Sequence, residues 1–316
     1  MRIVASTGTE SVAIVYIVDL GHDKLVECVE AVQPPLSRDR KWVLLISTMY
    51  GCPVKCMMCD AGGHYQGKLS KTEIFEQIDF LVQQRFPDRI VPSAQFKIQL
   101  ARMGEPALND HVLDVLDELP ERYDAPGLMP SLSTIAPFGT RRFFDRLLAI
   151  KQAKYSGGHF QFQFSLHTTD AHRRDQIIPV RKWTLAEMAD YGERFYQAGD
   201  RKITLNFALA QGNPIEPAVL LNHFDPDRFL IKITPLNPTH RATEHGLTSY
   251  IDPLQASRNY EIAQALLEAG YEVIVSIGES EENYIGSNCG QYVMRHLQAS
   301  SQIQSGYTYP LRTATG

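Results

Sequence analysis

The sequence has no apolar run close to the roughly 20 residues that a membrane-spanning helix requires. Its first residues include acidic side chains and do not have the charged-then-apolar layout of a signal peptide. It also has no excess of positive charge, because 31 Lys and Arg residues stand against 36 Asp and Glu residues. This balance speaks against a surface that binds nucleic acid throughout, although a local basic patch is compatible with it. We therefore expect a soluble, cytoplasmic protein without a membrane partner.

Cysteine is scarce, and its five copies are unevenly spread. A secreted disulfide scaffold would carry an even number dispersed along the chain. Here Cys52, Cys56 and Cys59 lie within eight residues. A tight cluster of this kind in a long chain indicates a metal site rather than a disulfide framework.

Short β-rich runs alternate with amphipathic stretches along most of the 316 residues. Alternating hydrophobicity predicts strands near 43–49, 96–104, 128–135, 160–167, 203–209, 229–236 and 271–277. Helical periodicity and start signals predict helices near 70–86, from 109, and near 141–150, 183–198, 215–223 and 251–269. The helix at 70–86 opens with Ser-x-x-Glu, which is an N-cap signal.

Strands that alternate with helices predict a parallel sheet with right-handed crossovers. Seven such strands favour a full or partial (β/α) barrel over a small doubly wound sheet, and the pattern leaves barrel closure open. Residues 11–32 look like a β-hairpin with Gly21, His22 and Asp23 at its turn. We expect an N-terminal hairpin extension over 1–40, a barrel domain over 41–298 and a C-terminal tail over 299–316.

Polar and reactive side chains follow the predicted strands. In a parallel sheet the carboxyl ends of the strands form one rim, where active sites lie. We expect this rim to gather the cysteine loop, Gly104, Glu105, Ser133, Ser165, His167, Asn237 and Cys289.

The spacing Cys-x-x-x-Cys-x-x-Cys suits a particular kind of metal centre. Three thiolates can hold three corners of a cubane iron–sulfur cluster and leave the fourth iron open to a ligand. The alternative is a structural zinc with His64 as fourth ligand, although paired Cys-x-x-Cys knuckles are the commoner zinc spacing.

The segment GCPVKCMMC (51–59), followed by Gly104-Glu105-Pro106, resembles the radical S-adenosylmethionine (SAM) superfamily. The segments ARMGEPALN, LSTIAP, FSLHTTDAHRRDQIIPV, ITPLNP and SNCGQY occur in the order, and at roughly the spacing, of the RlmN/Cfr family of ribosomal-RNA adenine methyltransferases. The resemblance covers about residues 11–298. It implies a partial (β/α) barrel of the radical SAM type, a [4Fe–4S] cluster, SAM, and an electron donor such as flavodoxin or ferredoxin.

The resemblance also assigns roles to individual residues. It implies that the three clustered cysteines ligate the cluster and that Gly104 and Glu105 bind the SAM amino group. It implies that Cys289 becomes methylated and delivers a carbon to the substrate. The implied lining of the SAM pocket is Ser133, Ser165, His167 and Asn237.

The sequence departs from the family at several points. Leu45 stands where the family has a second catalytic cysteine, and Met58 stands where an aromatic residue is usual. Because the barrel-like pattern starts at residue 43 after only a hairpin, we expect no counterpart of the family's N-terminal RNA-binding module, and the net charge is negative. Release of a carbon bound to cysteine sulfur needs a second thiol, which Leu45 does not supply.

The resemblance places a pocket carboxylate in the hairpin strand that contains Cys28. Glu30 fits that carboxylate by its distance from Pro35, and Glu27 is the other candidate. If Glu30 faces the pocket, Cys28 shares its face and becomes a candidate second thiol. A buried, purely structural Cys28 is the alternative.

Three functions follow. The first is a methyltransferase that acts on an unactivated sp² carbon through methyl-Cys289. The second is a radical SAM enzyme that makes a 5′-deoxyadenosyl radical for a non-methylating modification. The third is a non-catalytic zinc- or RNA-binding module. The substrate stays open between RNA and a peptide or small molecule, because phosphate contacts normally dominate affinity for RNA and the chain is net acidic.

Overall fold

The structure is a computed structural model that describes residues 1–21, 24–252, 255, 260–288, 303 and 306–313. Within these residues the strands are β1 (Arg2–Thr9), β2 (Ala13–Asp19), β3 (Leu25–Val32), β4 (Trp42–Ile46), β5 (Met49–Cys52), β6 (Gly63–Lys68), β7 (Phe96–Leu100), β8 (Leu128–Thr134), β9 (Gln161–Ser165), β10 (Ile203–Leu209), β11 (Phe229–Pro235), β12 (Val273–Val275) and β13 (Arg312–Thr313). The helices are α1 (Lys71–Arg85), the 3₁₀ turn η1 (Pro106–Leu108), α2 (His111–Arg122), α3 (Arg141–Lys154), α4 (Ala171–Ile177), α5 (Leu185–Phe195), α6 (Pro217–Leu221), α7 (His240–Glu244), α8 (Glu261–Glu268) and α9 (Ser280–Ile285).

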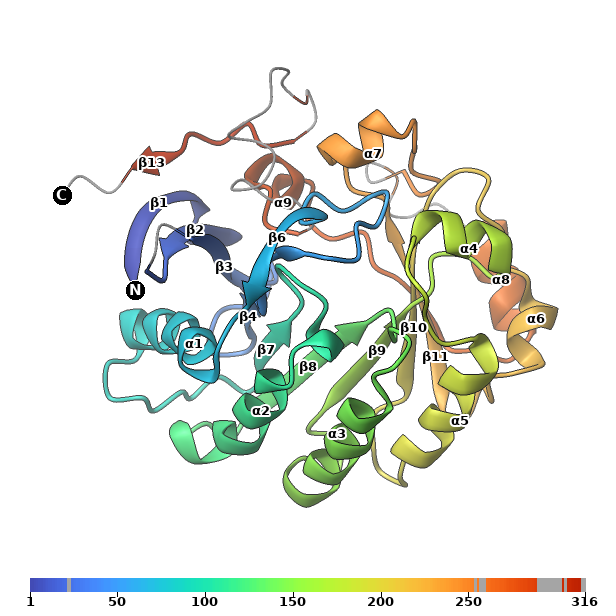
Figure 1. The fold of residues 1–316 in the computed structure, drawn as a ribbon, viewed down its shortest axis with the longest axis horizontal. Coiled ribbons are helices and arrows are strands. Elements are labelled where there is room, and N and C mark those ends of the chain that lie inside the picture. Colours follow the sequence, from blue (N-terminus) through green and yellow to red (C-terminus); the bar gives the residue numbers. More distant parts are fainter. Residues whose placement is uncertain (22–23, 253–254, 256–259, 289–302, 304–305, 314–316) are drawn as a thin grey trace.

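One sheet organises the molecule. Its strand order among the described residues is β12-β11-β10-β9-β8-β7-β4-β3-β2-β1-β13, and β5 and β6 form a separate two-stranded sheet. The run from β4 to β12 is parallel throughout, and its members are the seven strands that the sequence predicts. Figure 1 shows α1, α2, α3, α5 and α6 along the outside of this curved sheet. The mostly parallel α/β architecture is therefore confirmed; β12 and β13 lie at opposite edges, and the described strands do not join them.

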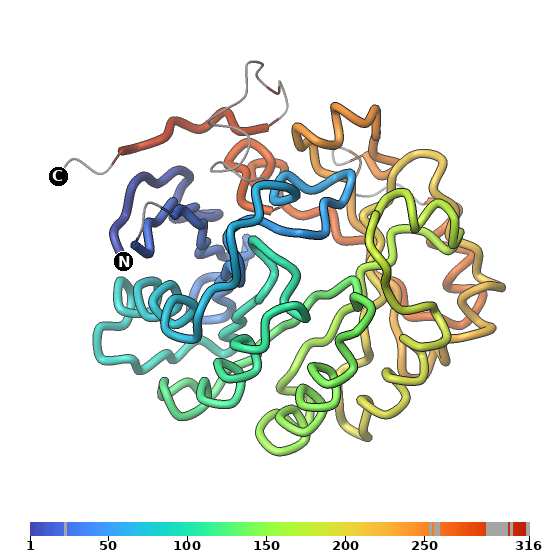
Figure 2. Tube along the Cα trace, in the orientation of Figure 1, coloured from blue at the N-terminus to red at the C-terminus, as the bar shows by residue number. Residues whose placement is uncertain are grey.

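The N-terminal hairpin is present as the antiparallel pair β2–β3, although two residues of its predicted turn, 22 and 23, lie outside the described residues. The sequence did not predict β1, which pairs with β2, or β13, which pairs with β1. Strand β3 pairs antiparallel with β4, so the hairpin continues the main sheet. Figure 2 shows the segment at β13 beside the N-terminal strands.

The two faces of the sheet have different cores. On the outer face, Trp42 and Leu44 belong to the large core beneath the helices. On the opposite face, here called the inner face, Val43 and Leu45 pack against a smaller cluster that contains Ile285 of α9. Because side chains alternate along a strand, each strand contributes to both faces.

The helix boundaries follow local chemistry. Ser70 caps α1 in a reciprocal capping box with Glu73, as its sequence signal predicts. Helix α2 begins at His111 rather than at Asn109, because the Asn109 amide donates to the carbonyl oxygens of Thr48 and Leu69, each at 2.8 Å. Helix α8 covers only the last part of the predicted range 251–269. Over the described part of the chain, no helix combines the length and apolar character needed to cross a bilayer.

Candidate functional site

The cysteine loop connects β5 to β6. Cys52 is the last residue of β5, and Cys56 and Cys59 follow in the loop. The sequence analysis expected a loop here but not the β5–β6 hairpin that frames it. Gly51 has a φ of 71°, and a Cβ there would lie 2.8 Å from the carbonyl oxygens of Gly63 and His64. Only glycine therefore permits the close approach at the base of the loop.

Two short helices hold the backbone of the cysteine loop. The Met57 N–H donates to the carbonyl oxygen of Ile177, at the end of α4, at 2.9 Å. On the other side, the Thr239 hydroxyl donates to the Met58 carbonyl oxygen at 2.8 Å, and Arg241 Nε donates to the Cys56 carbonyl oxygen at 3.1 Å. Residues before and within α7 thus fix the loop over its central residues.

Asp60, directly after the last clustered cysteine, is fully buried. Its carboxylate accepts the backbone N–H groups of His240 at 3.0 Å and Arg241 at 2.8 Å, and the Tyr307 hydroxyl at 3.2 Å. A carboxylate at a helix N-terminus satisfies otherwise unpaired N–H groups. The sequence analysis did not identify Asp60; the available signal was a charged residue next to the metal motif.

The three thiols lie near one another. Burial raises the pKa of Cys56 well above its usual range, and neighbouring Cys59 and Cys52 raise it further. Burial also raises the pKa of Cys52, to about 11. Neutral thiols are therefore favoured without metal, and binding of a cluster as thiolates would release protons.

The donor set fits an iron–sulfur cluster in another respect. Arg174 is buried, and its Nε has no hydrogen-bond partner among the described residues, while its charge is close enough to interact with a Cys56 thiolate. A positive charge near this position suits a centre that carries thiolate charge. His64, the fourth ligand of the zinc alternative, is exposed on β6. No three His, Cys, Asp or Glu side chains of the described residues are grouped to hold a single metal ion.

The Gly104-Glu105 segment packs against the strand end that leads to the cysteines. Gly104 has a φ of 104°, and a Cβ there would lie 2.7 Å from Thr48 Oγ1 and from Met49 Cβ. The Met103 carbonyl oxygen accepts the N–H groups of Thr48 at 2.7 Å and Met49 at 3.1 Å. This packing brings the Glu105 backbone close enough to Cys52 to act against the rise that burial causes in the pKa of the thiol.

The Glu105 side chain is buried and held by three donors. Its oxygens accept the Ala107 N–H at 3.1 Å, the Ile135 N–H at 3.0 Å and the Thr134 hydroxyl. Burial raises the pKa of Glu105 to about 7, although the three hydrogen bonds act in the opposite direction. A fixed, buried carboxylate of this kind is a strong partner for a cationic ammonium group.

His167 lies at the end of β9, with a φ of 67°. Its Nδ1 accepts the Ala208 N–H at 3.1 Å, so the neutral ring carries its proton on Nε2. Burial lowers the pKa of His167 to about 4, and nearby Arg174 lowers it further. Ser133 and Ser165 are half-buried at the ends of β8 and β9, as expected for the rim.

Asn237 follows β11, and its Oδ1 accepts the Asn288 side-chain amide at 3.3 Å. Asn237 thus contacts the residue that precedes Cys289. Cys289 itself lies outside the described residues.

The two candidate carboxylates of β3 face opposite sides of the sheet. Glu30 binds Arg85 of α1 at 2.6 Å and the Tyr16 hydroxyl at 3.2 Å, and so faces the outer helices. Cys28 shares this face, is fully buried, and has its pKa raised by burial. The structure therefore does not bring Glu30 and Cys28 together with the cysteine loop. The physical reason is strand alternation, which places Glu27 instead on the inner face.

Glu27 forms a fully buried ion pair with Arg102, the second residue after β7. Glu27 Oε2 accepts Arg102 Nη2 at 2.5 Å and Nε at 3.1 Å. The guanidinium also donates to the carbonyl oxygens of Gly286 and Ser287, both at 2.9 Å. The sequence analysis assigned no role to Arg102, which lies in the ARMGEPALN segment. A charged residue close to the end of a buried strand was the available signal for a buried ion pair.

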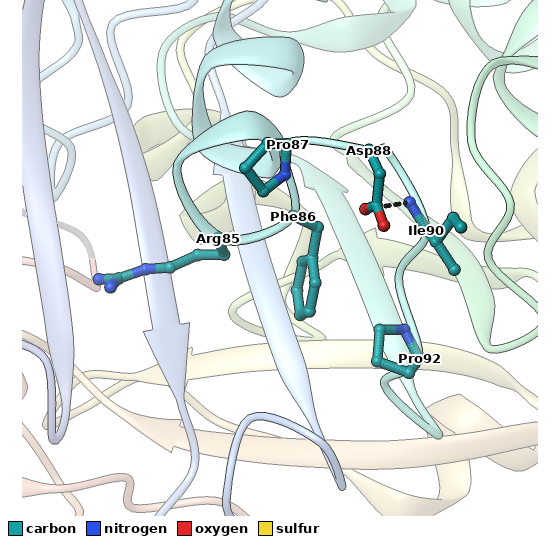
Figure 3. Close-up of a pocket in the computed structure, with 6 residues that line it drawn as sticks. All are labelled: Arg85, Phe86, Pro87, Asp88, Ile90 and Pro92. Carbon is teal, nitrogen blue, oxygen red and sulfur yellow. Dashed lines mark hydrogen bonds between the residues drawn. The ribbon is translucent and has the colours of Figure 1, made fainter.

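A surface hollow lies elsewhere, around the end of α1. Figure 3 shows its lining, which is Arg85, Phe86, Pro87, Asp88, Ile90 and Pro92. Phe86 packs edge-on against Trp42, the first residue of β4. The hollow is thus at the amino end of the strands, whereas the cysteine loop follows their carboxyl ends.

Comparison with solved structures identifies the class of fold. A radical SAM methyltransferase from Sphaerobacter thermophilus matches with a TM-score of 0.67 at 18% identity, over 92% of this chain and 81% of that one. At this identity the match establishes the fold, and the cysteine loop follows the carboxyl end of β4 in that fold. No protein-family model matches the chain.

Sequence relatives make the comparison more specific. A probable dual-specificity RNA methyltransferase RlmN from Chlorobium phaeobacteroides is 28% identical over 287 residues, which are 89% of this chain and 73% of the relative. A protein of the same name from Desulfitobacterium hafniense is 29% identical over 273 residues, which are 84% and 71% of the two chains. These comparisons confirm the predicted resemblance to the RlmN/Cfr family. They also confirm the prediction of an enzyme, because the matched proteins are methyltransferases.

Proposed function

We propose that this protein is a radical SAM methyltransferase that acts on an sp² carbon of RNA. The packing of the Gly104-Glu105 segment against Thr48 and Met49, at the start of the strand that ends at Cys52, carries the proposal. It joins the three-cysteine loop to the buried carboxylate that would hold a SAM ammonium group. A structural metal site needs no such carboxylate beside its ligands. The relatives' names supply RNA as the substrate class.

When bound, the cluster and SAM would supply a 5′-deoxyadenosyl radical by one-electron cleavage. Cys52, Cys56 and Cys59 would hold three irons, and the anchored loop would keep their spacing. Glu105 would orient SAM through its ammonium group, with Gly104 leaving room for it. Ser133, Ser165, His167 and Asn237 would line the pocket around it.

Cys289 would accept a methyl group on its sulfur and present it to the substrate. Its thiolate would form the S–C bond by displacing the methyl group from SAM, and S-adenosylhomocysteine would leave with the electron pair of the broken bond. Of the two candidate carboxylates, Glu27 rather than Glu30 lies on the side of the segment before Cys289, because its partner Arg102 binds the carbonyl oxygens of Gly286 and Ser287.

A second candidate function keeps the radical chemistry without methyl transfer. Leu45 pairs with Val29 on the inner face, and Cys28 faces the other way. Among the described residues, no cysteine outside the cysteine loop is therefore placed to supply the second thiol that the family has at the position of Leu45. In this case the product would be a modified peptide or small molecule.

The proposal has consequences for partners and organisation. Reduction of the cluster would need a one-electron donor such as flavodoxin or ferredoxin, and the enzyme would work in the cytoplasm. The barrel domain would span 41–298, with 1–40 as an extension of its sheet and 299–316 as a tail.

Anaerobic reconstitution tests the proposal. We expect about four irons per chain in the wild type, with loss of the cluster in Cys52→Ala, Cys56→Ala or Cys59→Ala. Full iron retention in any of these variants would remove the cluster assignment. Peptide mass spectrometry after growth on labelled methionine should find one labelled methyl group on Cys289. Formation of 5′-deoxyadenosine without S-adenosylhomocysteine, together with unmodified Cys289, would select the second candidate.

A further inference from the structure

Arg102 joins three separate segments at the inner face. Its Nε and Nη2 bind Glu27 of β3, and its Nη1 and Nη2 bind the carbonyl oxygens of Ser287 and Gly286. Both charged side chains have an exposed fraction of 0%. A planar guanidinium suits this task, because its donors are fixed in one fork.

The carbonyl groups that Arg102 binds belong to the end of α9. This helix ends at Ile285 and is capped by Gly286, which has a φ of 75°. The N–H groups of Gly286 and Ser287 donate back to the Glu282 carbonyl oxygen at 2.8 and 3.0 Å. Carbonyl groups at a helix end have no partner within the helix. Arg102 supplies that partner, and its positive charge suits the negative end of the helix.

Asn288 is held from another direction. Its side-chain amide donates to Asn283 Oδ1 at 2.8 Å and to Asn237 Oδ1 at 3.3 Å. Gly286 and Ser287 are therefore bound by Arg102, which follows β7, and Asn288 is bound by Asn237, which follows β11. They are also the three residues directly before Cys289.

A contribution to folding stability does not by itself explain the buried Glu27–Arg102 pair. A buried ion pair contributes little compared with apolar residues of similar size, whereas removal of one partner leaves an uncompensated charge. The contacts of Arg102 instead give it a geometric task, because they determine where residues 286–288 lie.

We propose that Arg102, held in place by Glu27, is a positioning residue that fixes residues 286–288 and thereby sets the reach of the Cys289 thiol. This inference rests on the proposed function, in which Cys289 accepts the methyl group. It gives Glu27 the role of an anchor for Arg102 rather than of a proton acceptor.

The test compares wild type with Arg102→Met and Arg102→Lys in the full chain with reconstituted cluster. We expect Arg102→Met to slow methylation of Cys289 by about a hundredfold, the size of effect that misplaced reacting groups produce. Iron content and reductive SAM cleavage to 5′-deoxyadenosine should stay near wild type. Arg102→Lys keeps the charge opposite Glu27 without the fork, so it should fold and still methylate slowly.

Lys151→Met is the matched control, because Lys151 forms a buried ion pair with Asp200 far along the chain from the site. It should reproduce any loss of stability without slowing methylation. Wild-type methylation rates in both Arg102 variants, or an equal loss in Lys151→Met, would overturn the inference.

A second readout does not depend on methyl transfer. The rate at which iodoacetamide alkylates Cys289 in cluster-free protein, measured by peptide mass spectrometry, should differ from wild type in both Arg102 variants and not in Lys151→Met. If wild-type Cys289 is never methylated, the proposed function fails, and this rate still decides the role of Arg102. Equal alkylation rates in all variants would overturn it.

Discussion

Glu105 is the residue whose chemistry is most constrained by its surroundings. Its carboxylate is buried and held by Ala107, Thr134 and Ile135. We expect Glu105→Ala to weaken SAM binding by about ten- to a hundredfold, which corresponds to one hydrogen bond between charged groups. Isothermal titration with SAM on reconstituted protein measures this. Iron content should be unchanged, and a loss of iron with unchanged SAM affinity would make Glu105 structural.

His167 gives a prediction about pH. Burial lowers its pKa from 6.5 to about 4, so between these values the unfolded chain binds a proton that the folded protein does not. The free energy of unfolding should therefore fall as the pH is lowered from about 6.5 toward 4, by about 2 kcal/mol at pH 5. Urea unfolding of wild type and His167→Asn between pH 7 and 5 compares the two slopes. Identical slopes would contradict a buried, neutral His167.

At the scale of residues, the sequence identifies types and spacing better than directions. The rim positions Glu105 and His167 were predictable because each follows a strand of a parallel sheet. The choice between Glu27 and Glu30 was not, because a one-residue difference in register exchanges the two faces of β3. Only the pairing of Glu30 with Arg85 and of Glu27 with Arg102 decides it.

Among the elements, the cysteine loop depends on its contact with α7. Asp60 accepts two backbone N–H groups at the start of that helix and the Tyr307 hydroxyl. We expect Asp60→Ala to cost about 1–3 kcal/mol of folding stability, since buried donors lose their acceptor, and to speed loss of the cluster. Asp60→Asn keeps an acceptor oxygen and should fall in between. Iron release to a chelator over time measures the effect, and equal release from all three proteins would show that α7 does not hold the loop.

The elements that the sequence missed share a physical cause. Strands β5 and β6 are short and contain Gly51, Gly63 and Gly67, so their composition indicates a loop. Their pairing comes from the close approach at Gly51. Helix α7 has only five residues, begins at His240 and has Thr239 as its N-cap. Such elements are stabilised by tertiary contacts more than by local propensity.

For the whole molecule, the N-terminal strands are part of the main sheet. Strand β3 forms a ladder with β4, and Glu27 neutralises buried Arg102. We expect a fragment over 41–316 not to fold, because it lacks β1, β2 and β3 of the main sheet and leaves buried Arg102 without its partner Glu27. Near-ultraviolet circular dichroism and limited proteolysis would show this. A fragment that lacks only residues 310–316 is the control and should stay folded, and a folded 41–316 fragment would make the extension a separate unit.

The pairing of β1 with β13 has a consequence for how the chain is made. Ala5 lies opposite Thr313 and Ser6 opposite Arg312, so two strands about three hundred residues apart in synthesis share one edge. While the ribosome is still translating the barrel, β1 has a neighbour on one side only. An unpaired strand edge invites association with other chains. A polypeptide that stops before β13 therefore exposes the backbone edge of β1 at Ala5 and Ser6, and it should associate with other chains more readily than the protein in which β13 is paired.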